Sequence, residues 1–167
     1  MLIRGTLMKK LILLRGNSGS GKTTTAKAIK ELLSPNAFLV SQDVLRKQML
    51  SEPDCKENKS ISLIKSNIEW GISNVDYIIL EGILKKSVYR SLLMTFKRRY
   101  THEMLIFYFN ISFNETLRRN QLKDAPFSEE ALLQWWQDKD LLGNEDYVFT
   151  DQEKLEQRLV IIKKHLE

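Results

Sequence analysis

The sequence predicts an α/β protein in which a five-stranded parallel sheet is covered by helices on both faces. Two observations predict this class. Short, unbroken apolar runs recur along the chain, and segments with helical periodicity lie between them. Because the runs do not alternate with polar residues, each strand is expected to be buried on both faces, as in parallel sheets. Strands that alternate with helices are typical of doubly wound domains.

The apolar runs and the helical periods place each element. Strands are expected at 11–14, 37–40, 77–80 and 104–109, with a weaker fifth at 147–149. Helices are expected over 23–33, 44–50, 61–72, 88–99, 114–122, 129–138 and 152–166. Ligands of open α/β sheets bind at the carboxyl ends of the strands, so functional residues should follow the strands.

Two of the later helices carry further signals. Ser128 is expected to cap the helix that follows it, although Ala131 takes the place of the Glu or Gln of a full capping box. Trp135 and Trp136 project about 100° apart on a helix, so we expect one in the core and the other over a cleft. In the last helix, an apolar stripe should dock on the core; it consists of Leu155, Leu159, Ile162 and Leu166.

Length and composition describe one ordinary globular domain. The 167 residues include 26 Lys and Arg against 21 Asp and Glu, a net charge of +5, and 43% of them are hydrophobic. A domain of about 100–200 residues accounts for the whole chain, 1–167, with residues 1–7 as a poorly ordered extension. The aliphatic content excludes disorder, and 7 Gly with 3 Pro exclude a collagen-like chain.

The chain is expected to stay in the cytoplasm. No apolar run approaches the roughly 18–20 residues of a membrane span, and no signal-peptide pattern opens the sequence. Cys55 is the single cysteine, so it cannot form an internal disulfide, in agreement with a reducing compartment. We therefore expect no membrane association, and the excess of basic residues points weakly to an anionic ligand.

The strongest motif follows the first predicted strand directly. Residues 16–23, Gly-Asn-Ser-Gly-Ser-Gly-Lys-Thr, match G-x-x-x-x-G-K-[ST] at every fixed position. Glycines let successive N–H groups turn inward around a phosphate, and the helix that begins there adds its positive N-terminus. Lys22 is expected to reach the β- and γ-phosphates, and Thr23 to coordinate Mg²⁺. The predicted contacts of a nucleoside triphosphate are Gly16, Asn17, Ser18, Gly19, Ser20, Gly21, Lys22, Thr23 and Thr24.

The second strand leads into Asp43 and Arg46, which share a helix face at spacing i, i+3. A carboxylate there can accept the proton of an attacking hydroxyl, and a guanidinium can bind an anionic substrate or the transferred phosphoryl group. The alternative is structural, because Asp is a common helix N-cap and such pairs are frequent on helices. Next to a phosphate loop we favour the functional interpretation.

The third strand ends in Glu81 and Gly82. An acid at this place is expected near the metal or the acceptor, so Glu81 joins Thr23 as a predicted Mg²⁺ residue. Gly82 is expected to leave room for substrate. A solvent-exposed glutamate after a strand is the alternative.

These motifs together resemble the P-loop kinases of the group that contains polynucleotide 5′-kinases, chloramphenicol phosphotransferase and zeta-toxin-like sugar-nucleotide kinases. The residues that carry the resemblance are Gly16 to Thr23, Asp43-x-x-Arg46, Glu81-Gly82 and Thr116-Leu117-Arg118-Arg119, and the similarity spans roughly residues 9–165. The resemblance implies a P-loop NTPase sandwich of three layers and an ATP- and Mg²⁺-dependent phosphotransferase. It further implies Asp43 as general base toward a hydroxyl acceptor and Arg46 as an acceptor contact.

The resemblance also implies a short helical lid, at about 114–127. Its basic residues would be Arg118, Arg119 and Lys123, with Arg119 as a catalytic cation over the transferred phosphate. The family pattern often reads Arg-x-x-x-Arg, and Lys123 in the second position supplies a charge without a bidentate fork. A solvated basic helix face is the alternative.

Two other functions stay open. A polynucleotide 5′-hydroxyl kinase would use the basic clusters Lys85-Lys86 and Lys97-Arg98-Arg99, but no recognised nucleic-acid-binding module accompanies them, so nucleic acid is not favoured. A nucleotide-gated ATPase switch would need no acceptor, and its GTPase version lacks the usual Asn-Lys-x-Asp string. The acceptor, the choice between ATP and GTP, and the oligomeric state are not predicted.

Overall fold

The strands form one parallel sheet in the order β2-β3-β1-β4-β5. The computed structural model describes residues 9–122 and 124–167. The strands are β1 (Lys10–Gly16), β2 (Ala37–Ser41), β3 (Tyr77–Gly82), β4 (Met104–Phe109) and β5 (Tyr147–Phe149). The predicted α/β class and all five strands are confirmed, while the expected extension at residues 1–7 lies outside the described residues.

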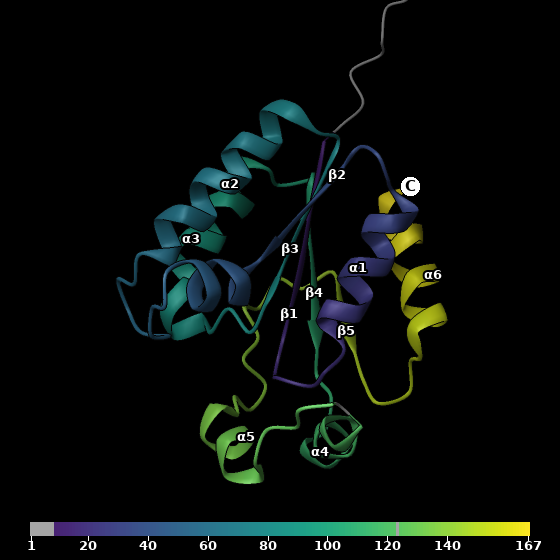
Figure 1. Cartoon of the computed structure of the whole chain (residues 1–167). Coiled ribbons are helices and arrows are strands. Elements are labelled where there is room, and N and C mark those ends of the chain that lie inside the picture. Colours follow the sequence, from purple (N-terminus) through teal and green to yellow (C-terminus); the bar gives the residue numbers. More distant parts are fainter. Residues whose placement is uncertain (1–8, 123) are drawn as a thin grey trace, which may run out of the picture.

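Helices cover both faces of the sheet, as Figure 1 shows. The helices α1 (Lys22–Leu32) and α6 (Leu155–Leu166) lie on one face, and α2 (Ser60–Asn74) and α3 (Lys86–Arg99) on the other. The shorter α4 (Phe113–Gln121) and α5 (Glu129–Trp135) lie beyond the carboxyl ends of the strands. A single π-helical stretch, η1 (Val44–Met49), follows β2. None of the helices in the described ranges is long and apolar enough to span a membrane.

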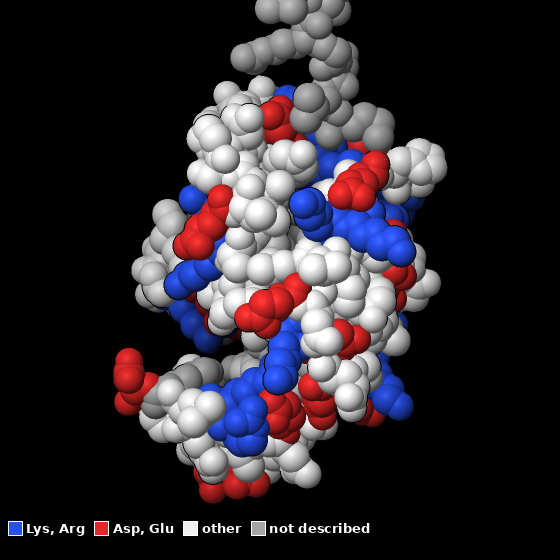
Figure 2. All heavy atoms as spheres, turned by 90° about the vertical axis from the view of Figure 1, so that its right-hand side faces the viewer, with Lys and Arg blue, Asp and Glu red and all other residues white. Residues whose placement is uncertain are grey.

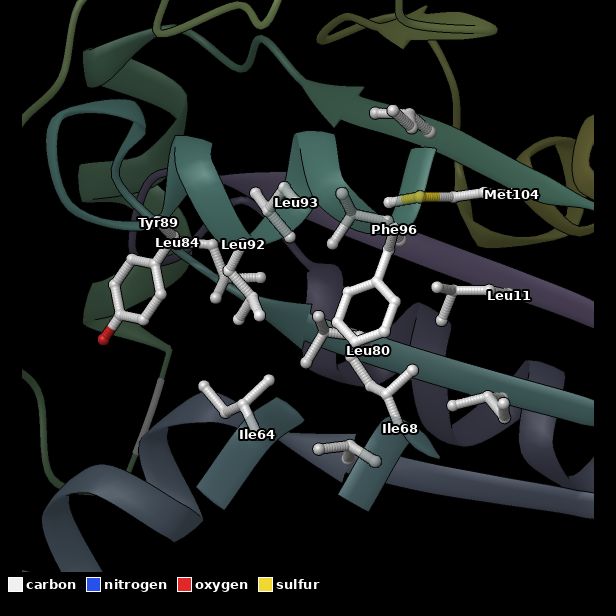
Figure 3. Packing of buried hydrophobic residues seen from close by; sticks show 14 of the residues in the cluster. Leu11, Ile64, Ile68, Leu80, Leu84, Tyr89, Leu92, Leu93, Phe96 and Met104 are labelled. Atoms are coloured by element: carbon white, nitrogen blue, oxygen red, sulfur yellow. The ribbon is translucent and has the colours of Figure 1, made fainter. Parts of the chain in front are cut away.

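Burial on both faces explains the unbroken apolar runs. Along β1, Leu11 and Leu13 belong to the cluster under α2 and α3, whereas Ile12 and Leu14 belong to the cluster under α1 and α6. Figure 3 shows the first cluster, in which side chains of α2 and α3 meet those of the central strands. The strands β1 to β4 therefore stabilise two cores each, whereas β5 contributes only to the cluster under α1 and α6.

Two helix boundaries differ from the prediction by three residues. The expected helix 129–138 ends at Trp135, because the Asn17 side chain binds both backbone groups of Gln137, at 2.7 and 2.9 Å. The expected helix 152–166 begins only at Leu155, because the Glu153 carboxylate accepts hydrogen bonds from the backbone and hydroxyl of Thr150 in the preceding turn. In the lid, α4 ends at Gln121, and the described residues from there to 127 are not helical.

The sheet constrains the start of the phosphate loop at Gly16, which gives the first testable prediction. Gly16 has φ +144°, and a Cβ there would lie 2.6 Å from the Phe109 carbonyl oxygen. Gly16→Ala should lower the free energy of unfolding by about 2–5 kcal/mol, from backbone strain plus overpacking. The matched control is Gly143→Ala, with φ +95° and no atom within 4 Å, which should cost only the strain. Equal losses in denaturant titrations of the two variants would contradict the close packing.

Candidate active site

The phosphate loop joins β1 to α1 as the motif predicts. Gly21 has a left-handed φ of +94° and caps α1, whose first residue is Lys22. The Lys22 ammonium is buried and donates to the Asn17 carbonyl at 2.7 Å and to the Ser20 hydroxyl at 3.3 Å. The loop therefore surrounds its own lysine, beside the positive end of a helix.

Glu81 lies where three strand ends meet. It is 3% exposed, and in the sheet it pairs with Ser41 of β2 and Leu14 of β1. Its Oε2 accepts a hydrogen bond from the Thr23 hydroxyl at 3.0 Å, and its Oε1 accepts one from the Ser41 hydroxyl at 2.5 Å. The structure thus brings the two predicted Mg²⁺ residues together, and the alternative of an exposed glutamate is wrong.

These oxygen donors fit a magnesium ion. Mg²⁺ is usually held by one or two carboxylates together with substrate phosphates and water, not by a cage of protein ligands. Accordingly, no group of three or more His, Cys, Asp or Glu suited to a metal occurs within the described residues. A buried carboxylate and a hydroxyl next to a phosphate loop are the chemistry that such an ion needs.

Asp43 and Arg46 form the predicted pair at the end of β2. Arg46 Nη2 lies 3.2 Å from Asp43 Oδ1, and Lys47 Nζ lies 3.3 Å from Oδ2. The Asp43 side chain is about half exposed and makes no capping hydrogen bond, so the N-cap part of the structural alternative is wrong, whereas the i, i+3 ion pair is formed. Arg46 is buried and donates through Nη1 to the Glu52 carbonyl at 2.8 Å.

The residues predicted for the nucleotide and those predicted for the acceptor line one cavity of about 370 Å³. Gly82 lines it too, but the space next to Gly82 is taken by the Gln42 side chain, whose Oε1 would lie 2.4 Å from a Cβ. The sequence-predicted residues in this cavity are Ser18, Gly19, Lys22, Thr23, Asp43, Arg46, Glu81 and Gly82. Lys85, which was expected only as part of a nucleic-acid-binding cluster, also lines the cavity, and Trp135 is the tryptophan that reaches it. The residues that sequence reasoning did not assign to a site are Lys47, Asp54, Ile83 and Phe127.

Trp135 and Trp136 make different contacts. Trp135 lines the cavity and meets Phe127 edge to face, with 5.1 Å between the ring centroids. Trp136 packs edge to face on Phe113, also at 5.1 Å. Both tryptophans are partly exposed, so the expectation of one fully buried in the core is wrong, whereas one over the cleft is what the structure shows. Ser128 caps α5 through Ala131, as predicted.

Helix α4, in the segment expected to form a lid, reaches the phosphate loop through Arg119. Its Nη1 donates to the Ser20 carbonyl at 3.0 Å, while its Nε binds Glu115 Oε1 at 2.6 Å. Arg118 binds the same carboxylate through two nitrogens, at 2.7 and 2.8 Å, and is largely exposed. Hydrogen bonds from Arg118 and Arg119 lower the pKa of Glu115 to about 2. The expected lid residue Lys123 lies outside the described residues.

Arg158 is a functional candidate that sequence reasoning missed. It comes from α6, is 4% exposed, and donates through Nη1 to the same Ser20 carbonyl at 3.3 Å. Among the described residues, its buried Nε and Nη2 have no hydrogen-bond partner. Burial, and then the nearby Arg119, lower the pKa of Arg158. The sequence contains a signal for it: Arg158 is a charged residue on the apolar face of the last helix, between Leu155 and Ile162.

Gly21 permits this approach, since a Cβ at that position would lie 2.6 Å from Arg158 Nη1. Next to the two arginines lies a second cavity of about 300 Å³. It is lined by Gly21, Thr24, Thr25, Arg119, Glu153, Lys154, Leu155 and Arg158. The phosphate loop therefore lies between two cavities, one on the side of Asp43 and one on the side of Arg158.

Fold and loop together define the class: this is a P-loop nucleotide-binding protein with the architecture of P-loop kinases. A family model described as "AAA domain" matches residues 11–139, and the chain belongs to that family. No curated protein matches the chain.

Solved structures of kinases share the fold. The APS kinase of Mycobacterium tuberculosis, solved with AMPPNP and APS, is 15% identical with a TM-score of 0.70, and the match covers 95% of this chain and 98% of that one. The gluconokinase of Sinorhizobium meliloti 1021 is 16% identical with a TM-score of 0.64, covering 95% and 92%. The shikimate kinase of Bacteroides thetaiotaomicron is 19% identical with a TM-score of 0.59, covering 93% and 98%. The predicted resemblance to P-loop kinases and the predicted three-layer fold are confirmed.

The low pKa of Glu115 gives a prediction about the lid. A carboxyl group with a depressed pKa stabilises the fold above its ordinary pKa, and this contribution disappears as the pH falls toward about 2. Glu115→Gln should therefore lower the unfolding midpoint at pH 7, and the difference from wild type should shrink as the pH falls below about 4.5. Denaturant titrations between pH 7 and 3 measure it. Glu31→Gln, an exposed position on α1, is the control; a pH-independent loss in Glu115→Gln would contradict the ionic origin.

Proposed function

We propose that this chain is an ATP- and Mg²⁺-dependent kinase that transfers the γ-phosphoryl group of ATP to a hydroxyl group of a small molecule. The observation that carries the proposal is the cavity of about 370 Å³ that holds Asp43 together with Lys22, Thr23 and Glu81. A nucleotide site and a carboxylate suited to act as a base thus share one space. The named structural relatives act on small molecules or carry kinase names, which supports the same class. A cytoplasmic location belongs to the proposal.

On the nucleotide side, the chain supplies positive charge and fixed N–H donors. The loop amides and the α1 N-terminus bind the phosphates, and Lys22 binds at the β- and γ-phosphates. Thr23 and Glu81 hold Mg²⁺, which when bound neutralises charge on the β- and γ-phosphate oxygens. Thr24, Arg119 and Arg158 line the second cavity, where we propose that the rest of the nucleotide lies.

On the acceptor side, Asp43 acts as the general base. The acceptor oxygen bonds to the γ-phosphorus as the bond from that phosphorus to the β–γ bridging oxygen breaks, and ADP leaves. The hydroxyl proton passes to Asp43, which returns it to water through its exposed edge. The buried Arg46 binds Asp43 Oδ1 and so holds the carboxylate in the orientation in which it accepts the proton.

A polynucleotide acceptor has less support. Two lysines of the basic clusters that would bind a phosphate backbone are engaged elsewhere. Lys85 lines the cavity of about 370 Å³, and Lys97 is bound to the Met104 carbonyl at 2.7 Å and to Asp146 at 3.7 Å. In Figure 2, basic and acidic side chains are intermingled on the face that carries α1 and α6. The charges on that face do not form a continuous basic track, the usual footprint of nucleic-acid binding; the cluster at 97–99 lies on α3, on the other side of the sheet.

The role of Asp43 is tested by Asp43→Asn. Turnover should fall by about 10²–10⁴-fold, because the amide accepts no proton, while the affinity for ATP should stay within about twofold. Lys22→Ala should instead lose both transfer and nucleotide binding. The measurements are γ-labelled phosphate transfer across a broad acceptor panel and calorimetric ATP titration, with the exposed Asp138→Asn as control. Unchanged turnover in Asp43→Asn would remove Asp43 as the base.

Arg158→Met tests the second cavity. The variant should bind ATP about tenfold to a hundredfold more weakly, the range expected for the loss of a charge-assisted hydrogen bond. Because the substitution also removes a buried charge without a full set of partners, the nucleotide-free protein should melt at an equal or higher temperature. Lys163→Met, exposed on the same helix, is the control. A lower melting temperature with unchanged ATP affinity would show a purely structural role.

A further inference from the structure

The acceptor side of the main cavity carries a line of alternating charges that begins at Asp43. Arg46 Nη2 lies 3.2 Å from Asp43 Oδ1, Arg46 Nε lies 3.8 Å from Asp54 Oδ1, and Lys85 Nζ lies 3.3 Å from Asp54 Oδ2. Lys47 adds another cation, 3.3 Å from Asp43 Oδ2. All five residues line the cavity, so the line leads along its wall from the proposed base to Lys85.

Cations outnumber carboxylates along this wall. Among the described residues of the acceptor side, Arg46, Lys47 and Lys85 stand against Asp43 and Asp54, three positive charges against two negative ones. On the nucleotide side of the same cavity, Lys22 and Glu81 balance each other. The surplus of one positive charge becomes two when Asp43 accepts a proton. Such a wall attracts an anion and repels a cation.

Asp54 organises the wall but does not neutralise it. Its Oδ1 accepts hydrogen bonds from Tyr89 Oη at 3.2 Å and from Gln42 Nε2 at 3.3 Å, so two uncharged groups fix the carboxylate. This carboxylate is the counterion of two cations. Lys85 lies close to Oδ2, whereas Arg46 Nε lies too far from Oδ1 for a hydrogen bond. The buried Arg46 Nε has no hydrogen-bond partner among the described residues. Asp54 therefore positions Lys85 and Arg46 without fully neutralising their charges.

Lys85 is held in place by the residue before it. Leu84 has a left-handed φ of +46°, which is unfavourable for a residue with a Cβ. Its N–H donates to Gln42 Oε1 at 3.0 Å, and its carbonyl accepts from Arg15 Nη2 at 2.8 Å and Nε at 3.1 Å. Arg15 is fully buried and forms an ion pair with Asp140 at 2.8 Å. These contacts fix the turn that directs Lys85 toward Asp54.

The same cavity also has aromatic side chains, and its space is small. Trp135 and Phe127 line it, and Lys47 Nζ lies 5.5 Å from the Trp135 ring centre. A volume of about 370 Å³ is near the lower end of the range for small-molecule sites, about 300–1,000 Å³, and the end of the triphosphate shares it. The acceptor is therefore a compact molecule whose carbon skeleton packs against the aromatic rings.

We propose that the acceptor is a small hydroxy compound with one anionic group, a carboxylate, sulfate or phosphate monoester, which Lys85 and Arg46 bind while the hydroxyl faces Asp43. The inference rests on the proposed kinase function, since Asp43 must face a hydroxyl. It adds a subsite for the anion, at the far end of the charged line from the base.

Matched acceptor pairs test this subsite. Gluconate is offered against glucose, glycerate against glycerol, and glycerol 3-phosphate against glycerol, each with Mg²⁺ and ATP. The anionic member of a pair should have a kcat/KM at least about tenfold higher. Lys85→Gln should raise KM for the anionic member by about tenfold to a hundredfold, with kcat and the KM for ATP changed by less than about twofold. Lys86→Gln, the exposed neighbouring lysine, should behave like wild type.

The outcomes separate the subsite from the kinase function. The subsite is overturned if the anionic and neutral acceptors of a pair have equal kcat/KM, or if Lys85→Gln lowers kcat/KM equally for both. Either result leaves the kinase function standing. If no acceptor is phosphorylated although ATP binds, the kinase function fails, and calorimetry with sulfate in the presence of saturating Mg²⁺ and AMPPNP decides the subsite. Sulfate binding by wild type and Lys86→Gln but not by Lys85→Gln supports it, and no binding by wild type overturns it.

Discussion

The buried carboxylate of Glu81 is the constraint on which the arrangement of the site depends. Burial of a charged group is costly unless it is hydrogen-bonded, and here the compensating hydroxyls come from Thr23 at the start of α1 and Ser41 at the end of β2. Because β3 lies between β1 and β2, the sheet register fixes Glu81 relative to Ser41 and to β1, and the phosphate loop connects β1 to Thr23. The phosphate loop ends at Thr23, and Asp43 follows Ser41 by two residues. The positions of the nucleotide and acceptor sides therefore follow from one polar cluster.

Positive charge is distributed on both sides of the phosphate loop. Lys22 and Arg46 line the main cavity, while Arg119 and Arg158 share the Ser20 carbonyl at the second cavity. Burial lowers the pKa of Arg158, and the repulsion between the two guanidinium groups near one neutral oxygen lowers it further. Part of the net charge of +5 is thus concentrated where we propose that a nucleotide binds.

The sequence predicted what depends on local pattern and missed what depends on distant contacts. The strands and the phosphate loop were identifiable because apolar runs and a glycine motif are local signals. The end of α5 was not, since it is set by Asn17, 120 residues away in sequence. Arg158 was overlooked because its helix was interpreted only as an apolar stripe, and Asp54 because its polar loop carries no motif. The roles of the predicted residues toward ATP and an acceptor remain predictions that the experiments above address.

The link between Asn17 and Gln137 also explains why a short helix can form a wall of the acceptor side. Helix α5 has only Leu132 buried, so packing alone fixes it weakly. The two hydrogen bonds of the Asn17 amide join the end of α5 to the phosphate loop, two residues after Trp135. Trp135 lines the same cavity as the charged residues and is held by the same loop that carries Lys22. The loop that surrounds the phosphates and the aromatic wall of the acceptor side therefore hold each other in place.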